Sequence, residues 1–531
     1  MSVKNSRFAI SMILFSLLLT LPAWPTSAAG TTWYVDDDAC PGPGSGTVGD
    51  PFCLIQDAID AATADDIIEI AAGTYHEHLS MYTSLTVNGA GRTSTILDGN
   101  ATGRVFYVHS GITVSIHSLT IQNGSADDGG GILNYGSLTL NDVKIQNNQA
   151  LYYGGGIYHS SIVGKLSLMN SEVSNNQATD ASSGGGGIYS VGQLILETVT
   201  VDSNSAGYEG GGITLYGSDS LLDMSYTYVT NNSVTAAGGD GGGIASALGS
   251  ATIYGSTISG NTATGAGGAG GGISTNTSMN LQYSVVSGNT ADDVGGGIMH
   301  WYGDLNVTHT AVRANTILDA SGAGAGIYAS LGTLELSAVE VSGNSAPYAG
   351  GGVDSGASAS ITNTTISGNS AQFGGGLLIS SAGSSSLLNS TITANFEPTG
   401  TGVGGIYAAS PLTIQNTIVA GNEQDECWDI SGPNITSLGN NIEDSNTCGF
   451  SASGDQPNTD PLLGLLADNG GETQTHLPGA PAIDAGNNPA CPATDQRDVI
   501  RPIDGDLSGP ALCDVGAVEV RLKLYLPLIV R

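Results

Sequence analysis

The sequence predicts an all-β protein. We expect a right-handed, single-stranded parallel β-helix (a solenoid) of about 12 coils, with an N-terminal capping helix and a small disulfide-bearing C-terminal module. A Gly-Gly-Gly-Ile element recurs along most of the chain, and its apolar anchors lie 24 to 31 residues apart. Each unit also holds three short apolar stretches bounded by Gly, Asn and Ser, a pattern typical of strands and turns.

The apolar anchors mark the first strand of each unit. They are Ile132, Ile157, Ile188, Ile213, Ile244, Ile273 and Ile298, with variants ending at Ile327, Val353, Leu377 and Ile406. Periods of about 20–50 residues indicate a solenoid, a propeller or an array. A propeller blade needs about 40 residues and four strands, whereas three strands in about 25 residues fit one turn of a triangular β-helix.

The third strand of each unit carries an apolar residue three positions before an asparagine. Equivalent residues of successive coils stack about 4.8 Å apart. We therefore expect a structural asparagine ladder whose amides bond along the axis and stabilise a tight turn, since Asn tolerates the left-handed conformation. Its members are Asn148, Asn176, Asn204, Asn232, Asn261, Asn289, Asn315, Asn344, Asn369 and Asn395, and Asn422 continues the pattern.

Both ends depart from the repeat. Lys4 and Arg7 precede an apolar stretch that ends in a small-residue site, which predicts a signal peptide over residues 1–29. Apolar residues at helical spacing predict a capping helix at 55–62, because an open coil exposes unpaired strand edges. The expected division is residues 30–110 for the cap and first coils, 111–425 for the repeats, 426–520 for the C-terminal module and 521–531 for an apolar tail.

Six cysteines lie only at the two ends of the chain: Cys40, Cys53, Cys427, Cys448, Cys491 and Cys513. An even number in an exported protein favours disulfides, and six cysteines allow 15 connectivities. We expect sequential pairing, because each such pair closes a short loop outside the repeats. Zinc binding is the alternative, but no Cys-x-x-Cys occurs and the spacing is not that of metal fingers.

The charge restricts the class of partner. The chain carries 47 acidic and 12 basic residues, and two of the basic ones lie in the predicted signal peptide. Such a negative field repels phosphate backbones, so we expect no nucleic-acid partner. It also disfavours polyanionic substrates unless cations bridge the two. No apolar run beyond the signal peptide reaches the length of a membrane span.

The motifs resemble those of known β-helix proteins. The Gly-Gly-Gly-Ile and Asn-x-Ala repeats resemble bacterial β-helix surface proteins, including polymorphic outer-membrane proteins. Ile55-Gln56-Asp57-Ala58-Ile59 and Gly73-Thr74-Tyr75 resemble the N-terminal cap of pectin-lyase-like folds. The segments 460–486 and 513–519 are similar to the C-terminal module of choice-of-anchor proteins, and the final residues resemble a sorting or anchoring tail. These resemblances imply the fold strongly and the function weakly.

Pectin-lyase-like folds include lyases, hydrolases and esterases, but their machinery is not evident in this sequence. Neither a Ser/His/Asp arrangement nor a metal-ligand cluster stands out among the eight histidines. The fallback catalytic candidates are Glu209, Asp240 and Arg313. The two acids precede the anchors of adjacent coils by four residues, so they should lie about 5 Å apart. That separation fits a retaining glycosidase or a surface Ca²⁺ site, and also ordinary soluble turn residues.

Aromatic residues suggest a binding face. If each anchor points inward, the positions one and three residues beyond it point outward. Those positions hold Tyr135, Tyr158, Tyr189, Tyr216, Trp301, Tyr328 and Tyr407. A row of exposed rings could stack on sugars or dock a protein, although tyrosine also favours strands for structural reasons.

We therefore expect a secreted or cell-surface bacterial protein for surface display, adhesion or binding of an extracellular glycan or protein, without an identifiable catalytic centre. The alternative is an extracellular polysaccharide lyase or glycoside hydrolase, and a third reading is an architectural spacer. We expect a monomer with no membrane span after signal removal and no cofactor, although it could bind Ca²⁺.

Overall fold

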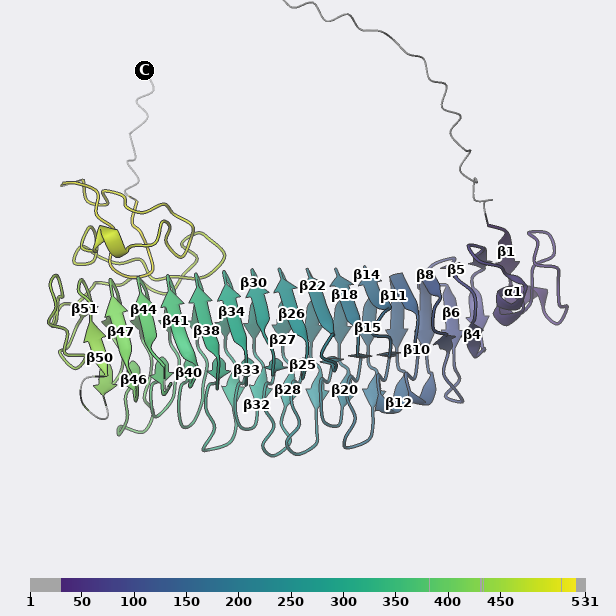
Figure 1. The fold of residues 1–531 in the computed structure, drawn as a ribbon, viewed down its shortest axis with the longest axis horizontal. Coiled ribbons are helices and arrows are strands. Elements are labelled where there is room, and N and C mark those ends of the chain that lie inside the picture. Colours follow the sequence, from purple (N-terminus) through teal and green to yellow (C-terminus); the bar gives the residue numbers. More distant parts are fainter. Residues whose placement is uncertain (1–29, 382, 430–431, 433, 508, 522–531) are drawn as a thin grey trace, which may run out of the picture.

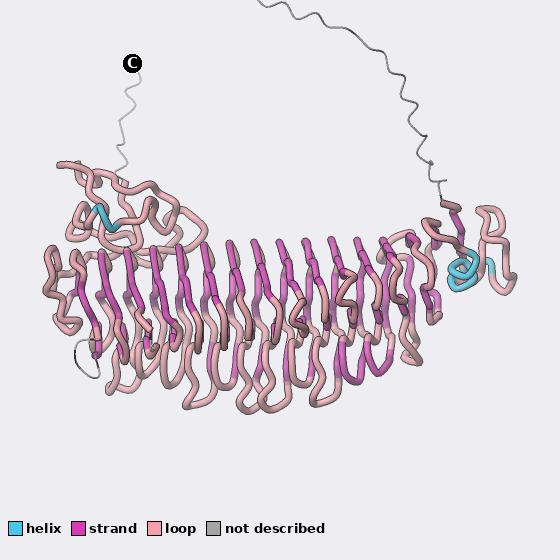
Figure 2. The backbone as a smooth tube through the Cα atoms, viewed as in Figure 1, coloured by secondary structure: helices cyan, strands magenta, loops and turns pink. Residues whose placement is uncertain are grey.

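The chain winds into a parallel β-solenoid of about 13 turns (Figure 1), seen here in a computed structural model. The structure describes residues 30–381, 383–429, 432, 434–507 and 509–521. The predicted signal peptide and all but the first residue of the predicted tail lie outside these ranges. Strands stack in rows along the axis, whereas the C-terminal module consists mainly of loops (Figure 2).

A capping helix closes the N-terminal end, as predicted. Helix α1 spans Ile55–Ala61 and buries Ile55, Ala58 and Ile59 against the first strands. The Glu77 carboxylate accepts hydrogen bonds from the backbone N–H groups of Ile55 (2.8 Å) and Gln56 (3.0 Å), so it satisfies two donors at the start of the helix. A 3-10 turn, η1 (Asp37–Ala39), precedes the helix.

The strands that begin at the anchors form a 14-stranded parallel sheet, in which each anchor pairs with the anchor of the next coil. Its strands are β4 (Leu79–Met81), β7 (Phe106–Val108), β10 (Ile132–Asn134), β13 (Ile157–His159), β17 (Ile188–Ser190), β21 (Ile213–Leu215), β25 (Ile244–Ser246), β29 (Ile273–Thr275), β33 (Ile298–His300), β37 (Ile327–Ala329), β40 (Val353–Ser355), β43 (Leu377–Ile379), β46 (Ile406–Ala408) and β49 (Cys427–Asp429).

A 29-stranded sheet forms the second side, and most coils contribute two strands to it. The first strand of each coil belongs to the series β5 (Leu85–Gly89), β8 (Thr113–Gln122), β11 (Ser137–Gln146), β14 (Lys165–Met169), β18 (Gln193–Glu197), β22 (Leu221–Ser225), β26 (Ser250–Tyr254), β30 (Met279–Gln282), β34 (Asp304–Thr308), β38 (Thr333–Ser337), β41 (Ser358–Thr362), β44 (Ser385–Leu388), β47 (Leu412–Gln415) and β50 (Ile435–Ser437).

The second strand of each coil belongs to the series β15 (Glu172–Ser174), β19 (Thr200–Asp202), β23 (Tyr228–Thr230), β27 (Thr257–Ser259), β31 (Val285–Ser287), β35 (Ala311–Arg313), β39 (Glu340–Ser342), β42 (Thr365–Ser367), β45 (Thr391–Thr393), β48 (Ile418–Ala420) and β51 (Ile442–Glu443). Four N-terminal strands complete this sheet: β1 (Thr32–Val35), β2 (Ile67–Ile70), β3 (Gly73–Tyr75) and β6 (Thr95–Asp98).

A third sheet of eight short strands follows the asparagine turns. It comprises β9 (Ser125–Asp128), β12 (Gln149–Tyr153), β16 (Gln177–Ala178), β20 (Ser205–Ala206), β24 (Ser233–Val234), β28 (Thr262–Ala263), β32 (Thr290–Ala291) and β36 (Thr316–Ile317). The anchors and the apolar residues of the other strands fill one continuous core inside the coils.

The asparagines of the third strand form a buried ladder. Asn204 shows the repeating geometry, since its backbone N and its Nδ2 both donate to Oδ1 of Asn232, at 2.9 and 3.0 Å. Its Nδ2 also donates to the carbonyl of Val173, at 2.9 Å. The same pattern runs from Asn148 to Asn422, where the Glu426 carboxylate accepts the last two bonds. Each amide therefore fixes the height of one coil relative to the next.

The C-terminal module docks on the flank of the last coils, over the ends of the strands (Figure 1). It contacts one column of tight turns: Asn363 donates to the carbonyl of Thr494 (2.8 Å), and Asn389 donates to that of Asp514 (3.2 Å). Three disulfides join Cys40 to Cys53, Cys427 to Cys448 and Cys491 to Cys513, which is the sequential pairing expected from the sequence. All six cysteines are paired, so they form no zinc site.

Among the described residues, no helix is long and apolar enough to cross a membrane.

Replacing an asparagine in the middle of the ladder should destabilise the solenoid. We expect Asn261→Ala to lower the free energy of unfolding by about 2–4 kcal/mol, because it leaves the buried backbone N–H of Asn232 and the carbonyl of Val229 without partners. Denaturant unfolding monitored by circular dichroism measures this change. The exposed Asn276 is the control, and equal losses for Asn276→Ala and Asn261→Ala would contradict the role of the ladder.

Candidate functional site

One outer face of the solenoid carries two neighbouring columns of side chains, which we call the aromatic face. The first column follows each anchor in the 14-stranded sheet and runs Tyr107, Leu133, Tyr158, Tyr189, Thr214, Ala245, Ser274, Met299, Tyr328, Asp354, Leu378, Tyr407 and Trp428. The second precedes the first glycine and includes Tyr153, Glu209, Asp240, Ala269, Val294, Ala323, Ala349 and Phe373. Tyr135, Tyr216 and Trp301 lie beside them.

Aromatic rings contact one another along this face in two runs. In the N-terminal run, ring centroids lie 5.8 Å apart for Tyr107–Tyr135, 5.4 Å for Tyr158–Tyr189 and 6.3 Å for Tyr189–Tyr216. In the C-terminal run they lie 6.0 Å apart for Trp301–Tyr328, 5.4 Å for Phe373–Tyr407 and 6.3 Å for Tyr407–Trp428. Most coils of each run contribute a ring, so both runs extend along the solenoid axis, but the Val353 coil carries Asp354 in place of a ring.

The seven aromatic residues singled out from the sequence all lie on this face, but they are unequally exposed. Tyr216 is 48% exposed, and Tyr135, Tyr158, Trp301, Tyr328 and Tyr407 are partly exposed. The expectation of an exposed ring is wrong for Tyr189, which is only 5% exposed because Tyr153 packs over it with centroids 4.6 Å apart.

Sequence reasoning missed several members of the face. Tyr153 and Phe373 precede the glycines, a position expected to hold soluble turn residues. Tyr107 and Trp428 belong to the irregular first and last coils, where the repeat is hard to align. Arg104 was also missed, and its guanidinium lies 5.8 Å from the centroid of the Tyr107 ring. Alignment of the post-anchor position through every coil would have found the two terminal aromatics.

Small side chains and two acids lie between the aromatic runs. The first column there holds Thr214, Ala245 and Ser274, all of them buried. Beside them Glu209 pairs in register with Asp240, so these residues sit on adjacent coils as the sequence indicated. Coil spacing places them about 5 Å apart.

Both acids hold protons more tightly than usual. Burial raises the pKa of Glu209, whose carboxylate has no hydrogen-bond or ion-pair partner in the described part of the chain. Burial, and then the charge of Glu209, raise the pKa of Asp240 to about 7. Burial thus favours the protonated form of both carboxyls, and carboxyls so perturbed mark candidate functional sites.

Arg313 does not join this pair. It lies at the end of β35 in the 29-stranded sheet, three coils further along the axis than Glu209, or about 14 Å. The structure therefore separates the three fallback catalytic residues into an acidic pair and a distant arginine. Among the described residues, neither Glu209 nor Asp240 forms an ion pair with a Lys or Arg of the kind that lyase chemistry would need as a base.

A third carboxyl is buried within the C-terminal aromatic run. Asp354 follows Tyr328 in the first column and is only 8% exposed. Its surroundings are apolar and include Ala323, Ala349 and Leu378. Burial raises the pKa of Asp354 to about 7, so this side chain is largely neutral at mildly acidic pH.

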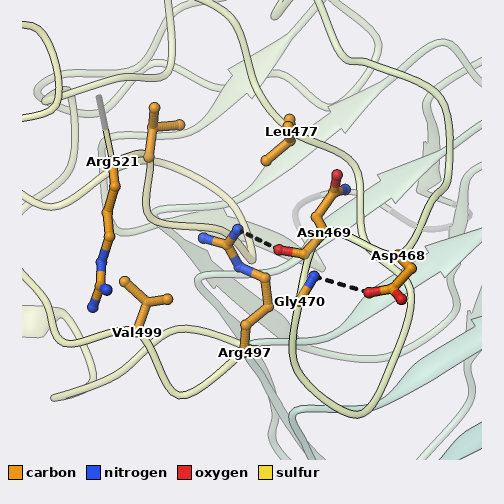
Figure 3. Close-up of a pocket in the computed structure, with 8 residues that line it drawn as sticks. Asp468, Asn469, Gly470, Leu477, Arg497, Val499 and Arg521 are labelled. Carbon is orange, nitrogen blue, oxygen red and sulfur yellow. Dashed lines mark hydrogen bonds between the residues drawn. The ribbon is translucent and has the colours of Figure 1, made fainter. Parts of the chain in front are cut away.

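A cavity of about 760 Å³ lies in the C-terminal module (Figure 3). Arg497 is among the residues that line it, but its donors are used within the module. They reach the Asn469 carbonyl (3.2 Å), the Asp495 carboxylate (2.7 Å) and the Glu519 carbonyl. The arginine therefore holds three loops together rather than presenting free donors to a ligand.

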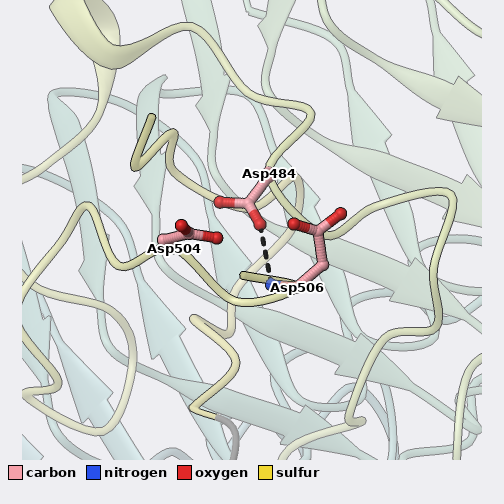
Figure 4. Close-up of side chains that lie close together, drawn as sticks. All are labelled: Asp484, Asp504 and Asp506. Atoms are coloured by element: carbon pink, nitrogen blue, oxygen red, sulfur yellow. Dashed lines mark hydrogen bonds between the residues drawn. The ribbon is translucent and has the colours of Figure 1, made fainter. Parts of the chain in front are cut away.

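Three acids in the same module lie close together: Asp484, Asp504 and Asp506 (Figure 4). Each offers one carboxylate oxygen, and these oxygens lie within 4.8 Å of one another. Asp484 Oδ2 also accepts bonds from the backbone N–H groups of Gly505 (2.9 Å) and Asp506 (3.0 Å). Oxygen ligands suit Ca²⁺, so these residues could hold that ion, and calcium binding stays a prediction.

Comparison of the sequence with protein-family models and with curated proteins gave no match. Comparison with solved structures found loose similarities. The A-module of mannuronan C-5 epimerase AlgE4 from Azotobacter vinelandii has a TM-score of 0.41 at 15% identity, over 76% of this chain and 99% of that one. Pectate lyase Pel9A has 0.30 at 14% identity, over 93% and 97%.

Pectin methylesterase PemA from Erwinia chrysanthemi has a TM-score of 0.29 at 13% identity, over 44% of this chain and 80% of that one. Since all three scores lie below 0.5, the assignment of the fold rests on the coil geometry of this chain itself.

The buried carboxyl of Asp354 should make stability depend on pH. Because its pKa is raised from 3.8 to about 7, its contribution is fully present below pH 4 and is lost as the pH rises through 7. We expect Asp354→Asn to be more stable than the parent by about 2–4 kcal/mol at pH 8 and nearly equal to it at pH 4. Thermal unfolding across this range measures the difference, with the exposed Asp223→Asn as control. A parent-like Asp354→Asn at pH 8 would contradict the shift.

Proposed function

We propose that this protein is an extracellular, surface-displayed glycan-binding β-helix, and that the aromatic face binds the sugar chain. The observation that carries the proposal is the pair of aromatic runs, in which most coils contribute a ring to a single face along the axis. A polysaccharide is itself a linear repeat. Parallel alignment therefore lets successive sugar units meet successive coils.

The chemistry of the face suits the apolar side of a pyranose ring. Tyrosine and tryptophan offer a flat apolar surface with a polar edge, as binding sites for partly polar ligands require. Between the runs, the small side chains of Thr214 and Ser274 do not project from the sheet. The carboxyls of Glu209 and Asp240 can accept hydrogen bonds from sugar hydroxyl groups or donate to them.

The charge favours neutral sugars over uronates. The described part of the aromatic face carries Glu209, Asp240 and Asp354, and its cation Arg104 sits at the N-terminal end with its Nη2 bound to the carbonyl of Asp128 (2.7 Å). A polyuronate laid along the face would meet the negative field of the whole chain. We therefore expect neutral glycans to bind more tightly than pectate or alginate.

Display outside the cell is part of the proposal. Three disulfides fit an oxidising compartment. The resemblance of segments 460–486 and 513–519 to choice-of-anchor modules suggests that the C-terminal module joins the solenoid to the cell surface. The module lies over the last coils (Figure 1) and contacts the column of turns at Asn363 and Asn389, which belongs to the 29-stranded sheet and not to the 14-stranded sheet of the aromatic face.

Removing rings should weaken glycan binding. We expect the double variant Tyr158→Ala/Tyr216→Ala to bind a neutral polysaccharide at least about tenfold more weakly, because each ring supplies stacking area. Affinity electrophoresis against a panel of plant, algal and bacterial polysaccharides measures this. The exposed Tyr302, which has no ring neighbour among the described residues, provides the control variant Tyr302→Ala. Unchanged binding in the double variant would contradict the role of the face.

A second candidate function is hydrolysis of the bound glycan, and one observation favours it: Glu209 and Asp240 lie on adjacent coils beside the rings, and the pKa values of both are raised. Carboxyls about 5 Å apart are the spacing of retaining glycosidases, in which the protonated group acts as the general acid and the ionised one as the nucleophile. The protonated member would donate to the glycosidic oxygen. The other would form a bond to the anomeric carbon, which water later cleaves.

This candidate predicts a specific loss of turnover. If the protein hydrolyses a panel polysaccharide, Glu209→Gln and Asp240→Asn should each lower kcat at least about 100-fold with little change in binding. Release of reducing ends measures turnover, and its rate should fall above pH 7 as Asp240 loses its proton. Binding of a polysaccharide without product release would exclude hydrolysis as the function and support the role in surface display.

A further inference from the structure

A second row of rings lies on a different side of the solenoid, along the turns between paired strands of the 29-stranded sheet. It consists of Tyr226, Tyr254, Tyr283 and His309, which we call the turn row. Ring centroids are 5.6, 5.3 and 4.7 Å apart in that order, and the last pair is stacked with an interplanar angle of 6°. Tyr226 is 56% exposed, Tyr254 38% and Tyr283 39%.

The backbone at this row is unfavourable for tyrosine. Tyr226 and Tyr283 occupy the left-handed region, with φ of 49° and 50°. Most equivalent turns of other coils hold residues that tolerate this region well, such as Asp142, Asn170, Gly255 and Asn363, although Thr198 and Ala338 also occupy it. A bulky side chain in this conformation strains the backbone, and strain of this kind is often found at ligand-binding positions.

The turn row leads directly to the C-terminal module. His309 Nε2 lies 3.1 Å from Asp498 Oδ1 of the module, and beyond it the module covers the same column of turns through Asn363 and Asn389. The three tyrosines are therefore the uncovered continuation of the surface on which the module is seated.

A cavity of about 200 Å³ opens at the junction of solenoid and module. Val285, Arg313, Glu340, Glu472 and Gln474 are among the residues that line it. The Glu340 side chain is held in one position, because it is 1% exposed and its carboxylate accepts hydrogen bonds from Ser342 Oγ (2.6 Å) and from the backbone N–H of Gln474 (2.9 Å). Val285 follows Tyr283 by two residues, so the cavity lies at the end of the row.

Arg313 supplies donors at this junction. The side chain is exposed and makes no hydrogen bond or ion pair with another side chain in the described part of the chain. Glu340, Asp468 and Glu472 line the same cavity and offset its positive charge. The cavity therefore combines guanidinium donors with carboxylate acceptors and has no net attraction for an anion.

Together these features fit one class of ligand. Exposed rings bind the apolar faces of pyranoses, and mixed donors and acceptors bind hydroxyl groups. We propose that the turn row and the junction cavity form a second site for a neutral oligosaccharide, whose chain lies on Tyr226, Tyr254 and Tyr283 and whose terminal sugar occupies the cavity beside Arg313. This site is separate from the aromatic face, and it does not rest on the function proposed for that face.

The experiment is isothermal titration calorimetry of the full chain with soluble xylo-, manno- and cello-hexaose and with oligogalacturonate. We expect at least one neutral hexaose to bind, and Tyr254→Ala/Tyr283→Ala to weaken that binding about tenfold or more. Arg313→Gln should weaken it about three- to tenfold, whereas the control Tyr302→Ala leaves it unchanged. Thermal unfolding checks that each variant is folded.

Four results would contradict the proposal, and each can be told from the others. Loss of hexaose binding only in Tyr158→Ala/Tyr216→Ala would overturn the second site and support the aromatic face alone. Oligogalacturonate binding more tightly than every neutral hexaose would overturn the ligand class. The ligand class would also be overturned if a basic peptide such as oligolysine binds at the turn row and none of the hexaoses does. Failure of every hexaose to bind also overturns the proposal.

Discussion

The asparagine ladder is the interaction on which the rest of this structure depends. Each buried amide bonds to the amide and the backbone of the neighbouring coil, so the height of every coil is fixed to that of the next. A slip of one residue would turn inward-facing side chains outward. Because the ladder prevents that slip, a residue type that recurs once per coil becomes a straight column on the surface. Tyr226, Tyr283 and His309 stand in one such column with Tyr254 in the column next to it, and the aromatic face combines neighbouring columns.

Three partly or fully buried carboxyls give the aromatic face groups that can exchange protons. Burial raises the pKa values of Glu209, Asp240 and Asp354. In-register stacking also brings Glu209 and Asp240 together on adjacent coils. The same register that stabilises the fold thus creates an acidic pair with raised pKa values.

The fold could be predicted from the sequence because one physical pattern repeats. Anchors, asparagines and strand alternation recur in every coil, so each copy supports the interpretation of the others. The C-terminal module has no such repetition, and nothing local in Asp498 or Thr494 shows that they contact the turn column. The turn row was missed for a similar reason: Tyr226 and Tyr283 stand where a left-handed turn favours Asn or Gly, and their alignment becomes visible only in three dimensions.

The candidate site could be predicted only in part. Counting from the anchors identified Tyr158 and the pairing of Glu209 with Asp240, because register follows from the repeat. The same counting could not show that Tyr153 covers Tyr189, since that contact crosses from one column to the other. The same counting places Arg313 on the third strand, directly after Val312, whereas Glu209 and Asp240 precede the anchors, so the separation of the arginine from the acids could have been inferred from the repeat.

The central claim is that sugar units follow the coils along the aromatic face, and a crystal structure with a bound neutral hexasaccharide tests it most directly. The account predicts density for successive pyranose rings on Tyr158 and Tyr216, with the chain parallel to the solenoid axis. Ordered sugar found only away from both columns of this face, or crossing the coils at right angles, would contradict it.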